Sequence, residues 1–143
     1  MDTQSHGLNI SWIPASGFQL RKAGVQFDAV RIGGEDGRRV AELMEAITGG
    51  DPGPIVAESK GARALYFLVP PGSTAFRAWP DGVSVLNAGP DKVSYVPVCA
   101  LGGGTWPLAW WCPPTEEGRF VHVKLLAGVA EALLSPASRP SLE

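Results

Sequence analysis

The stretch that decides the fold runs from Gly53 to Pro114 and reads GPIVAESKGARALYFLVPPGSTAFRAWPDGVSVLNAGPDKVSYVPVCALGGGTWPLAWWCPP. In it, short runs of β-branched, aromatic and other apolar residues alternate with turns made of Gly, Pro, Asp and Ser. The runs predict five strands, at about 54–58, 63–69, 83–87, 93–98 and 106–111. Short strands joined by tight turns indicate a mostly antiparallel sheet.

One helix is expected before this stretch and another after it. Apolar residues recur at helical spacing from Val40 to Ile47, and Gly49-Gly50 ends that helix. A similar pattern predicts a second helix at about 121–134, and a strand at 25–32 precedes the first helix. The order of elements predicts an α+β fold, with a mostly antiparallel sheet packed against two helices on one of its faces.

The chain is expected to form a single domain over residues 1–143. Its length and its hydrophobic content of 45% are sufficient for a packed core, which we place at about 25–134. Residues 9–20 are interpreted as a short strand or an irregular covering segment. Residues 1–8 and 135–143 are polar or rich in Pro and Ser, so they are expected to be loose.

Charge and composition restrict the classes of function. The net charge of −2 argues against a protein-wide attraction to nucleic acid, but eight of the twelve basic residues are Arg, so a local basic stripe is compatible with it. Cys99 and Cys112 show no metal-binding spacing and are expected to be thiols, and two His are too few for a zinc site. No cofactor is expected. No apolar run approaches the ~20 residues that span a bilayer, and no signal peptide is visible, so the expected location is the cytoplasm.

Four phrases carry a family resemblance: KGARALYF at 60–67, GVSV at 82–85, YVP at 95–97 and WWCPP at 110–114. Their order resembles the catalytic core of the bifunctional primase-polymerase (prim-pol) N-terminal domain family, over roughly Val25 to Leu134. The resemblance implies a prim-pol-like fold. It also implies a strand with paired metal-binding acids, a later hairpin with a His that contacts nucleotide phosphates, and a third acid on the next strand.

The positions that match this machinery mostly hold other residues. Asp28 matches the first acid, but Val30 stands at the second, Ala64 at the His and Ser84 at the third acid. Phosphoryl transfer with two metal ions needs clustered carboxylates, so polymerase activity is not expected. Asp28 remains a candidate for a weak divalent-metal site, because Mg²⁺ keeps several waters. The alternative is an Asp at a strand edge that accepts hydrogen bonds from neighbouring backbone.

Basic and aromatic residues suggest a binding surface. Lys60 and Arg63 flank a Gly in a turn, and with Arg38-Arg39 they are candidates for a small basic patch; the alternative is that they are simply solvated. Alternation places Trp106 and Trp110 on one face of the last strand and Trp111 on the other. At least two of these three Trp are expected to pack, while an exposed one is suited to stacking on bases or to binding a partner.

These observations lead to two hypotheses of different class. The first is a catalytically degenerate primase-polymerase-like domain that binds single-stranded nucleic acid or a nucleotide without polymerising, through Lys60, Arg63, Trp106 and Trp111. The second is a structural or protein-interaction module, with a dimer as one form of it, in which the Trp- and Pro-rich hairpin from Gly104 to Pro114 forms the contact. Neither hypothesis involves a membrane.

Overall fold

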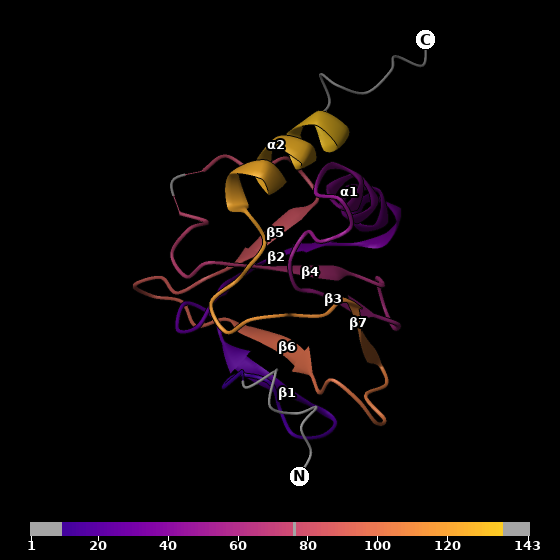
Figure 1. Cartoon of the computed structure of the whole chain (residues 1–143). Helices are drawn as coiled ribbons and strands as arrows, with labels where there is room; N and C mark the ends of the chain where they lie inside the picture. The colour runs from indigo at the N-terminus through magenta and orange to yellow at the C-terminus, as the bar shows by residue number, and fades with distance from the viewer. Residues whose placement is uncertain (1–9, 76, 136–143) are drawn as a thin grey trace.

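The computed structural model describes residues 10–75 and 77–135, and the elements lie in three layers (Figure 1). Two helices form the first layer, a five-stranded sheet the second and a two-stranded ribbon the third. The elements are β1 (Phe18–Lys22), β2 (Asp28–Ile32), α1 (Gly34–Ile47), β3 (Ile55–Glu58), β4 (Leu65–Val69), β5 (Val83–Leu86), β6 (Tyr95–Cys99), β7 (Leu108–Cys112) and α2 (Val123–Leu134). The predicted loose segments, apart from Ser135, lie outside the described residues. No helix within 10–75 and 77–135 is long and apolar enough to cross a membrane.

The central sheet has the strand order β5-β2-β4-β3-β7, and each neighbouring pair is antiparallel. All five residues of β4, LYFLV, are buried, because this strand lies in the middle of the sheet with a layer packed on each face. A strand that is covered on both faces carries a continuous apolar run instead of an alternating one. The predicted α+β class and the mostly antiparallel sheet are confirmed.

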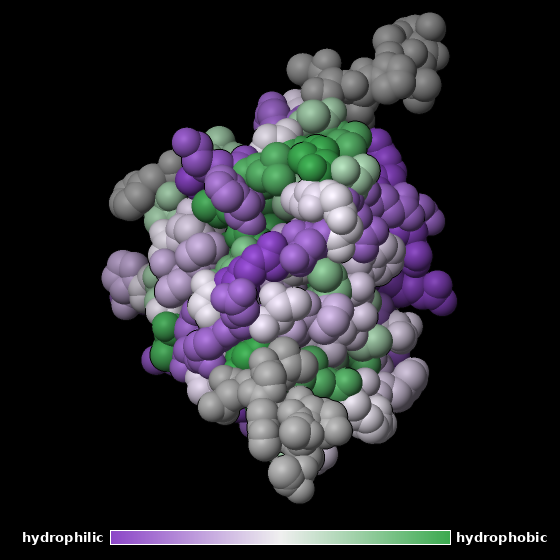
Figure 2. Space-filling view, viewed as in Figure 1, coloured by the Kyte–Doolittle hydropathy of each residue, from purple (hydrophilic) through white to green (hydrophobic). Residues whose placement is uncertain are grey.

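Both helices cover the same face of the sheet, as expected. Val40 and Met44 of α1 and Leu126 of α2 are buried against strand residues such as Val30 and Phe67. The outer side of α2 is not polar throughout: Leu125 and Leu133 are only half-buried. Figure 2 accordingly shows apolar surface gathered over α2.

The opposite face is covered by a ribbon that the sequence did not predict as a separate sheet. β1 pairs with β6 alone, so the strand expected at 93–98 lies in a second, two-stranded sheet. Trp12, Phe27 and Val98 form the core between this ribbon and the central sheet, and the rings of Trp12 and Phe27 meet edge to face with centroids 5.0 Å apart. Within residues 10–20, the described part of the predicted covering segment, the chain therefore contains both a covering portion and the first residues of a regular strand.

Several predicted boundaries shift for identifiable reasons. The strand predicted from Val25 begins at Asp28, because the Gly24 N–H donates to the Phe27 carbonyl and closes a turn there. The second helix begins at Val123 instead of 121, because the Val121 N–H donates to the Leu68 carbonyl of the sheet.

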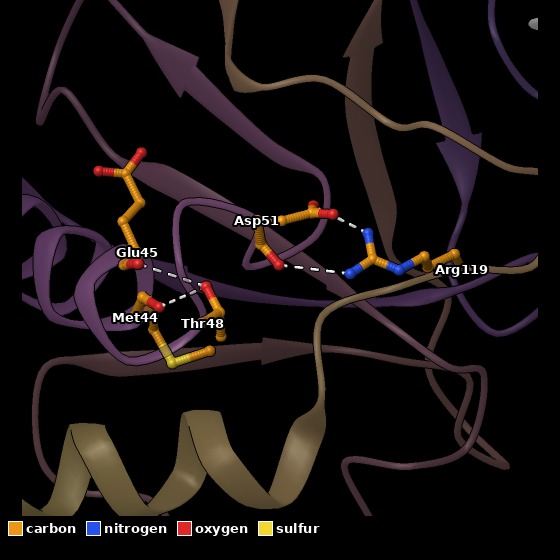
Figure 3. A network of polar contacts seen from close by, with 5 residues as sticks. All are labelled: Met44, Glu45, Thr48, Asp51 and Arg119. Carbon is orange, nitrogen blue, oxygen red and sulfur yellow. Dashed lines mark hydrogen bonds and ion pairs between the residues drawn. The ribbon is translucent and has the colours of Figure 1, made fainter.

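The first turn of α1 packs closely on the end of β2. A Cβ at Gly37 would lie 2.4 Å from the Ile32 carbonyl oxygen, so only glycine allows this approach. At the other end, the Thr48 hydroxyl donates to the Met44 carbonyl at 2.7 Å, where the predicted glycine pair follows the helix (Figure 3). Arg119 then binds the side chain and the carbonyl of Asp51, at 2.9 and 3.3 Å, and so joins the loop after α1 to the segment before α2.

Candidate functional site

A tight turn between β3 and β4 positions the two basic residues predicted for the site. The Arg63 N–H donates to the Lys60 carbonyl at 3.0 Å, and Gly61 provides a φ of 60°. Arg63 itself has a φ of 52°, which is uncommon for a residue other than glycine. The prediction that Arg63 begins the strand is therefore wrong: β4 begins at Leu65, and Arg63 is an exposed turn residue.

A β-bulge in β7 directs Trp111 toward the helices. Ile55 lies opposite Cys112 and Val56 opposite Trp110, so Trp111 is the extra residue between them. Bulges of this kind change the direction in which a side chain points. The Trp111 indole N–H donates to the Glu45 carboxylate of α1 at 3.0 Å.

The two adjacent Trp residues of β7 serve opposite faces of the sheet, as predicted. Trp110 packs toward the ribbon, and its indole N–H donates to the Cys99 carbonyl at 3.0 Å. Trp111 packs on the helix side. Trp106 was expected on the same strand face as Trp110, and this is wrong, because β7 begins at Leu108 and Trp106 lies in the preceding loop.

Trp111 and Arg63 line one pocket of about 320 Å³ between the start of α1 and the β3–β7 edge of the sheet. The lining residues are Gly34, Arg38, Ala57, Glu58, Ser59, Arg63, Leu65 and Trp111. The Arg38 guanidinium lies over the Trp111 ring, 5.7 Å from its centroid, which is within range of a cation–π contact. Neither Arg38 nor Arg63 forms an ion pair with a described residue, so both positive charges are available to a ligand.

A second pair of a cation and an aromatic ring lies beside this pocket. The Lys60 ammonium is 5.3 Å from the centroid of the Trp106 ring, and Trp106 is 70% exposed. The Ser59 N–H donates to the Pro107 carbonyl at 2.8 Å and holds the two loops together. We call the pocket and this pair together the Trp106–Trp111 surface, formed by Lys60, Arg63, Arg38, Trp106 and Trp111.

The structure separates the two neighbouring Arg residues of α1. Arg39 faces Asp36, 3.3 Å away, in an exposed ion pair, whereas Arg38 lies at the pocket. The sequence offers Arg38 only together with Arg39, as part of the basic patch. Arg38 and Glu45 are seven residues apart and therefore lie on one face of the helix, but only the fold shows that Trp111 lies along that face.

Asp28 occupies a different environment, because it is completely buried at the start of β2. Its Oδ2 accepts hydrogen bonds from the Gly72 N–H at 3.0 Å and from the Thr74 hydroxyl at 2.8 Å. Asn87 donates in turn to the Thr74 hydroxyl oxygen at 2.9 Å. The other carboxylate oxygen, Oδ1, has no partner among the described residues. The interpretation of Asp28 as an acceptor of backbone hydrogen bonds agrees with this geometry.

The other positions of the resemblance are spread over the sheet. Val30 and Ala64 are completely buried in the two different cores, and Ser84 is exposed on β5. Within 10–75 and 77–135, no three His, Cys, Asp or Glu side chains come together as a group that could hold a metal ion. A weak metal site at Asp28 stays a prediction. The carboxylate oxygen that such a metal would use is Oδ1, which is buried and accepts no hydrogen bond from a described residue.

Two further cavities contain guanidinium groups that are already engaged, beside one lysine each, Lys22 or Lys124. A cavity of about 410 Å³ near the start of α2 contains Arg77, which binds the Ser73 carbonyl, and Arg119, which binds Asp51. A cavity of about 260 Å³ contains Arg21, which binds the Trp12 carbonyl. The first pocket is the better candidate for binding an anion, because it brings together two guanidinium groups, those of Arg38 and Arg63, that have no ion pair with a described residue.

The two cysteines are free, as predicted, and are not suited to nucleophilic chemistry. Burial raises the pKa of the Cys99 thiol and also that of Cys112, where the carboxylates of Asp51 and Glu45 add to the effect. Both side chains are therefore protonated at neutral pH, and the reactive form of cysteine is the thiolate.

No protein-family model, no curated protein and no solved structure matches this chain. The resemblance to the prim-pol family therefore stays an expectation based on the four phrases, and the function must be argued from the geometry of the site.

Proposed function

We propose that this chain binds single-stranded nucleic acid or a nucleotide on the Trp106–Trp111 surface, as a primase-polymerase-like domain without polymerase activity. The observation that supports the proposal is the meeting of Arg38, Arg63 and Trp111 in one pocket, with Lys60 and Trp106 beside it. Residues from three distant parts of the chain contribute cations and aromatic rings to one surface.

The chemistry of this surface suits a single strand. Proteins bind single strands by combining a positively charged track for the phosphates with aromatic side chains on which bases stack. Arg63 and Arg38 provide planar guanidinium groups that pair well with phosphate oxygens. Trp106, at 70% exposure, offers a ring to a base, whereas Trp111 is held by Glu45 and forms a rigid wall.

The proposal does not include polymerase activity, because the positions that match the catalytic residues of the resembled family hold residues of other types. Val30, Ala64 and Ser84 occupy the positions that match metal-binding acids and a phosphate-binding His in the family that the chain resembles. None of these three side chains carries a charge, so they supply neither a carboxylate for a divalent metal nor a cation for a triphosphate.

The test is fluorescence anisotropy of labelled single-stranded DNA titrated with the protein, at low and at physiological salt, with and without Mg²⁺. Three cations predict weak binding, with a Kd of about 10⁻⁴–10⁻⁶ M and a log–log salt slope of about −2. Arg63→Ala and Arg38→Ala are each expected to weaken binding and to make the slope shallower by about 0.7, the contribution of one phosphate contact to a single strand.

Arg39→Ala is the matched control for these variants. It removes a guanidinium from the neighbouring helix position, but that guanidinium is paired with Asp36 and lies outside the pocket. Equal losses in Arg38→Ala and Arg39→Ala would show that binding is only non-specific attraction to charge. A flat titration at high micromolar protein would contradict the proposal itself.

One observation favours the second candidate function, a protein-interaction module. Trp106 and Leu101, which is 39% exposed, present apolar surface in the loop before β7. Exposed aromatic residues often dominate the energy of protein interfaces. Trp106→Ala is expected to weaken DNA binding under the first function, and to abolish self-association or partner capture without affecting DNA under the second.

A further inference from the structure

The ribbon of β1 and β6 carries exposed apolar side chains on its outer face. Phe18 and Leu20 of β1 are 45% and 59% exposed, Val93 is 59% exposed, and Tyr95 at the start of β6 is 53% exposed. We call these four residues the ribbon patch. They account for half of the exposed large hydrophobic residues of the described chain, and none of them belongs to the Trp106–Trp111 surface.

The strand register explains why these side chains gather. Val96 and Val98 are completely buried against the central sheet, so Tyr95 and Pro97, which alternate with them along β6, point outward. Leu20 lies opposite Pro97 and Lys22 opposite Tyr95, which places the exposed side chains of the two strands in adjacent rows. In the described part of the chain, no third strand joins the ribbon.

The size of the ribbon patch is that of the largest apolar patch on a typical monomer, a patch that often serves binding. Four large side chains, each about half exposed and each with about 200 Å² of surface, present roughly 400 Å² of adjoining apolar surface. If two copies pack these faces together, they remove about 800 Å² of apolar surface from water. The lower end of specific interfaces is about 1,200 Å², so residues beside the patch, such as Pro97 and Lys22, must supply roughly 400 Å² more.

We propose that the ribbon patch is the interface of a homodimer in which the outer faces of two ribbons pack together across a two-fold axis. Such an interface requires that one surface be complementary to itself. Lys22 is the one charged residue in the outward rows; it lies opposite Tyr95, two residues along β1 from Leu20. The centre of the patch offers no charge that would select a charged partner. An apolar sheet face of this kind packs well against another apolar sheet face, as the two sheets of a β-sandwich do.

The experiment is sedimentation velocity of the full chain from low to high micromolar concentration. The wild type is expected to sediment increasingly as a dimer. Leu20→Glu places a carboxylate at the centre of each face and is expected to weaken self-association at least tenfold, because a charge buried without a partner is unfavourable by more than that factor. Leu20 is 59% exposed, so the variant is expected to fold, and circular dichroism checks this.

Ile47→Glu provides the matched control, since Ile47 is 51% exposed but lies at the end of α1, in the layer of the helices. This variant is expected to dimerise like the wild type. A wild type that stays monomeric would overturn the proposal and leave the ribbon patch to residues 1–9 or to another protein. A dimer that survives Leu20→Glu but is lost in Trp106→Ala would also overturn it, in favour of the hairpin as the interface.

Discussion

Two groups of polar residues in this chain differ in how their hydrogen-bonding atoms are used. Around Asp28, the residues Gly72, Thr74 and Asn87 bind one another inside the protein, and Asp28 is completely buried. Around Arg38 and Arg63, the charged groups lie at a pocket without ion-pair partners among the described residues. The residue most like a catalytic acid is thus held inside the protein at one end of β2 and β4, whereas the charges without ion-pair partners lie at the opposite end of these strands.

The largest expected effect separates these two groups by stability. Asp28→Ala leaves the Gly72 N–H and the Thr74 hydroxyl without their acceptor, and it is expected to lower the free energy of unfolding by about 3 kcal/mol. Arg63→Ala removes an exposed group and is expected to change it by less than about 0.5 kcal/mol. Urea denaturation of both variants measures the difference.

Asp28→Asn provides the control, because it keeps one acceptor oxygen and the shape of the side chain. It is expected to restore most of the stability that Asp28→Ala loses. If Asp28→Ala were as stable as the wild type, the buried hydrogen bonds of Asp28 would not stabilise the fold. The role of Asp28 would then have to be sought in ligand or metal binding.

A smaller effect is expected from Thr74→Val. The substitution removes the hydroxyl that joins Asp28 to Asn87 but retains the shape, and it is expected to cost about 1–2 kcal/mol. Thermal denaturation followed by circular dichroism provides the measurement. Ser73→Ala is a useful comparison, because among the described residues the Ser73 hydroxyl bonds the Pro70 carbonyl alone, at the exposed surface. Equal losses of stability in the two variants would mean that the buried hydrogen bonds of Thr74 contribute no more than the exposed one of Ser73.

Trp111→Phe tests the wall of the pocket. It removes the hydrogen bond to Glu45, for which we expect a loss of about 1 kcal/mol in stability, and it weakens the contact with Arg38. DNA affinity should fall more in this variant than in Trp110→Phe, whose indole N–H bonds Cys99 on the other face. Anisotropy titrations of the two variants make the comparison, and the reverse order of affinities would contradict the assignment of the pocket.

The smallest effect on stability is expected from a pair of hydrogen bonds at the exposed surface. The Ser11 hydroxyl and N–H donate to the Glu117 carboxylate at 2.6 and 2.8 Å, and these bonds lower the pKa of Glu117 below its ordinary 4.5. A lowered pKa stabilises the fold above pH 4.5, and that contribution is lost as the pH falls through the lower value of the folded state. Glu117→Gln should therefore melt slightly below the wild type at pH 7, and the gap should close in acid. A gap of constant size across the pH range would contradict this origin.

The sequence predicted the elements whose signals are local. The spacing from Val40 to Ile47 and the glycine pair after it were sufficient to place α1, which ends at Ile47. Strands such as β3 and β5 were found because turn residues bound short apolar runs. The α+β class followed from the order of these elements.

Features that depend on pairing between distant segments were not predictable in the same way. The separation of β1 and β6 from the central sheet depends on which strand edges meet, and alternation in a single strand does not contain that information. The bulge at Trp111 depends on its partner strand β3. Likewise, Lys60, Arg63, Trp106 and Trp111 could be nominated from residue type, but Arg38 joins them only because α1 lies against β7.

The bulge in β7 also provides the protein with an optical signal. It places one indole at the rim of the pocket, with its N–H on a carboxylate and a guanidinium over its ring. Indole emission responds to the polarity and charge around the ring, so a ligand that enters the pocket changes the light that Trp111 emits. The difference between the emission spectra of the wild type and Trp111→Phe isolates this signal from the other four Trp residues. The pocket can thus report its own occupancy without a label on either molecule.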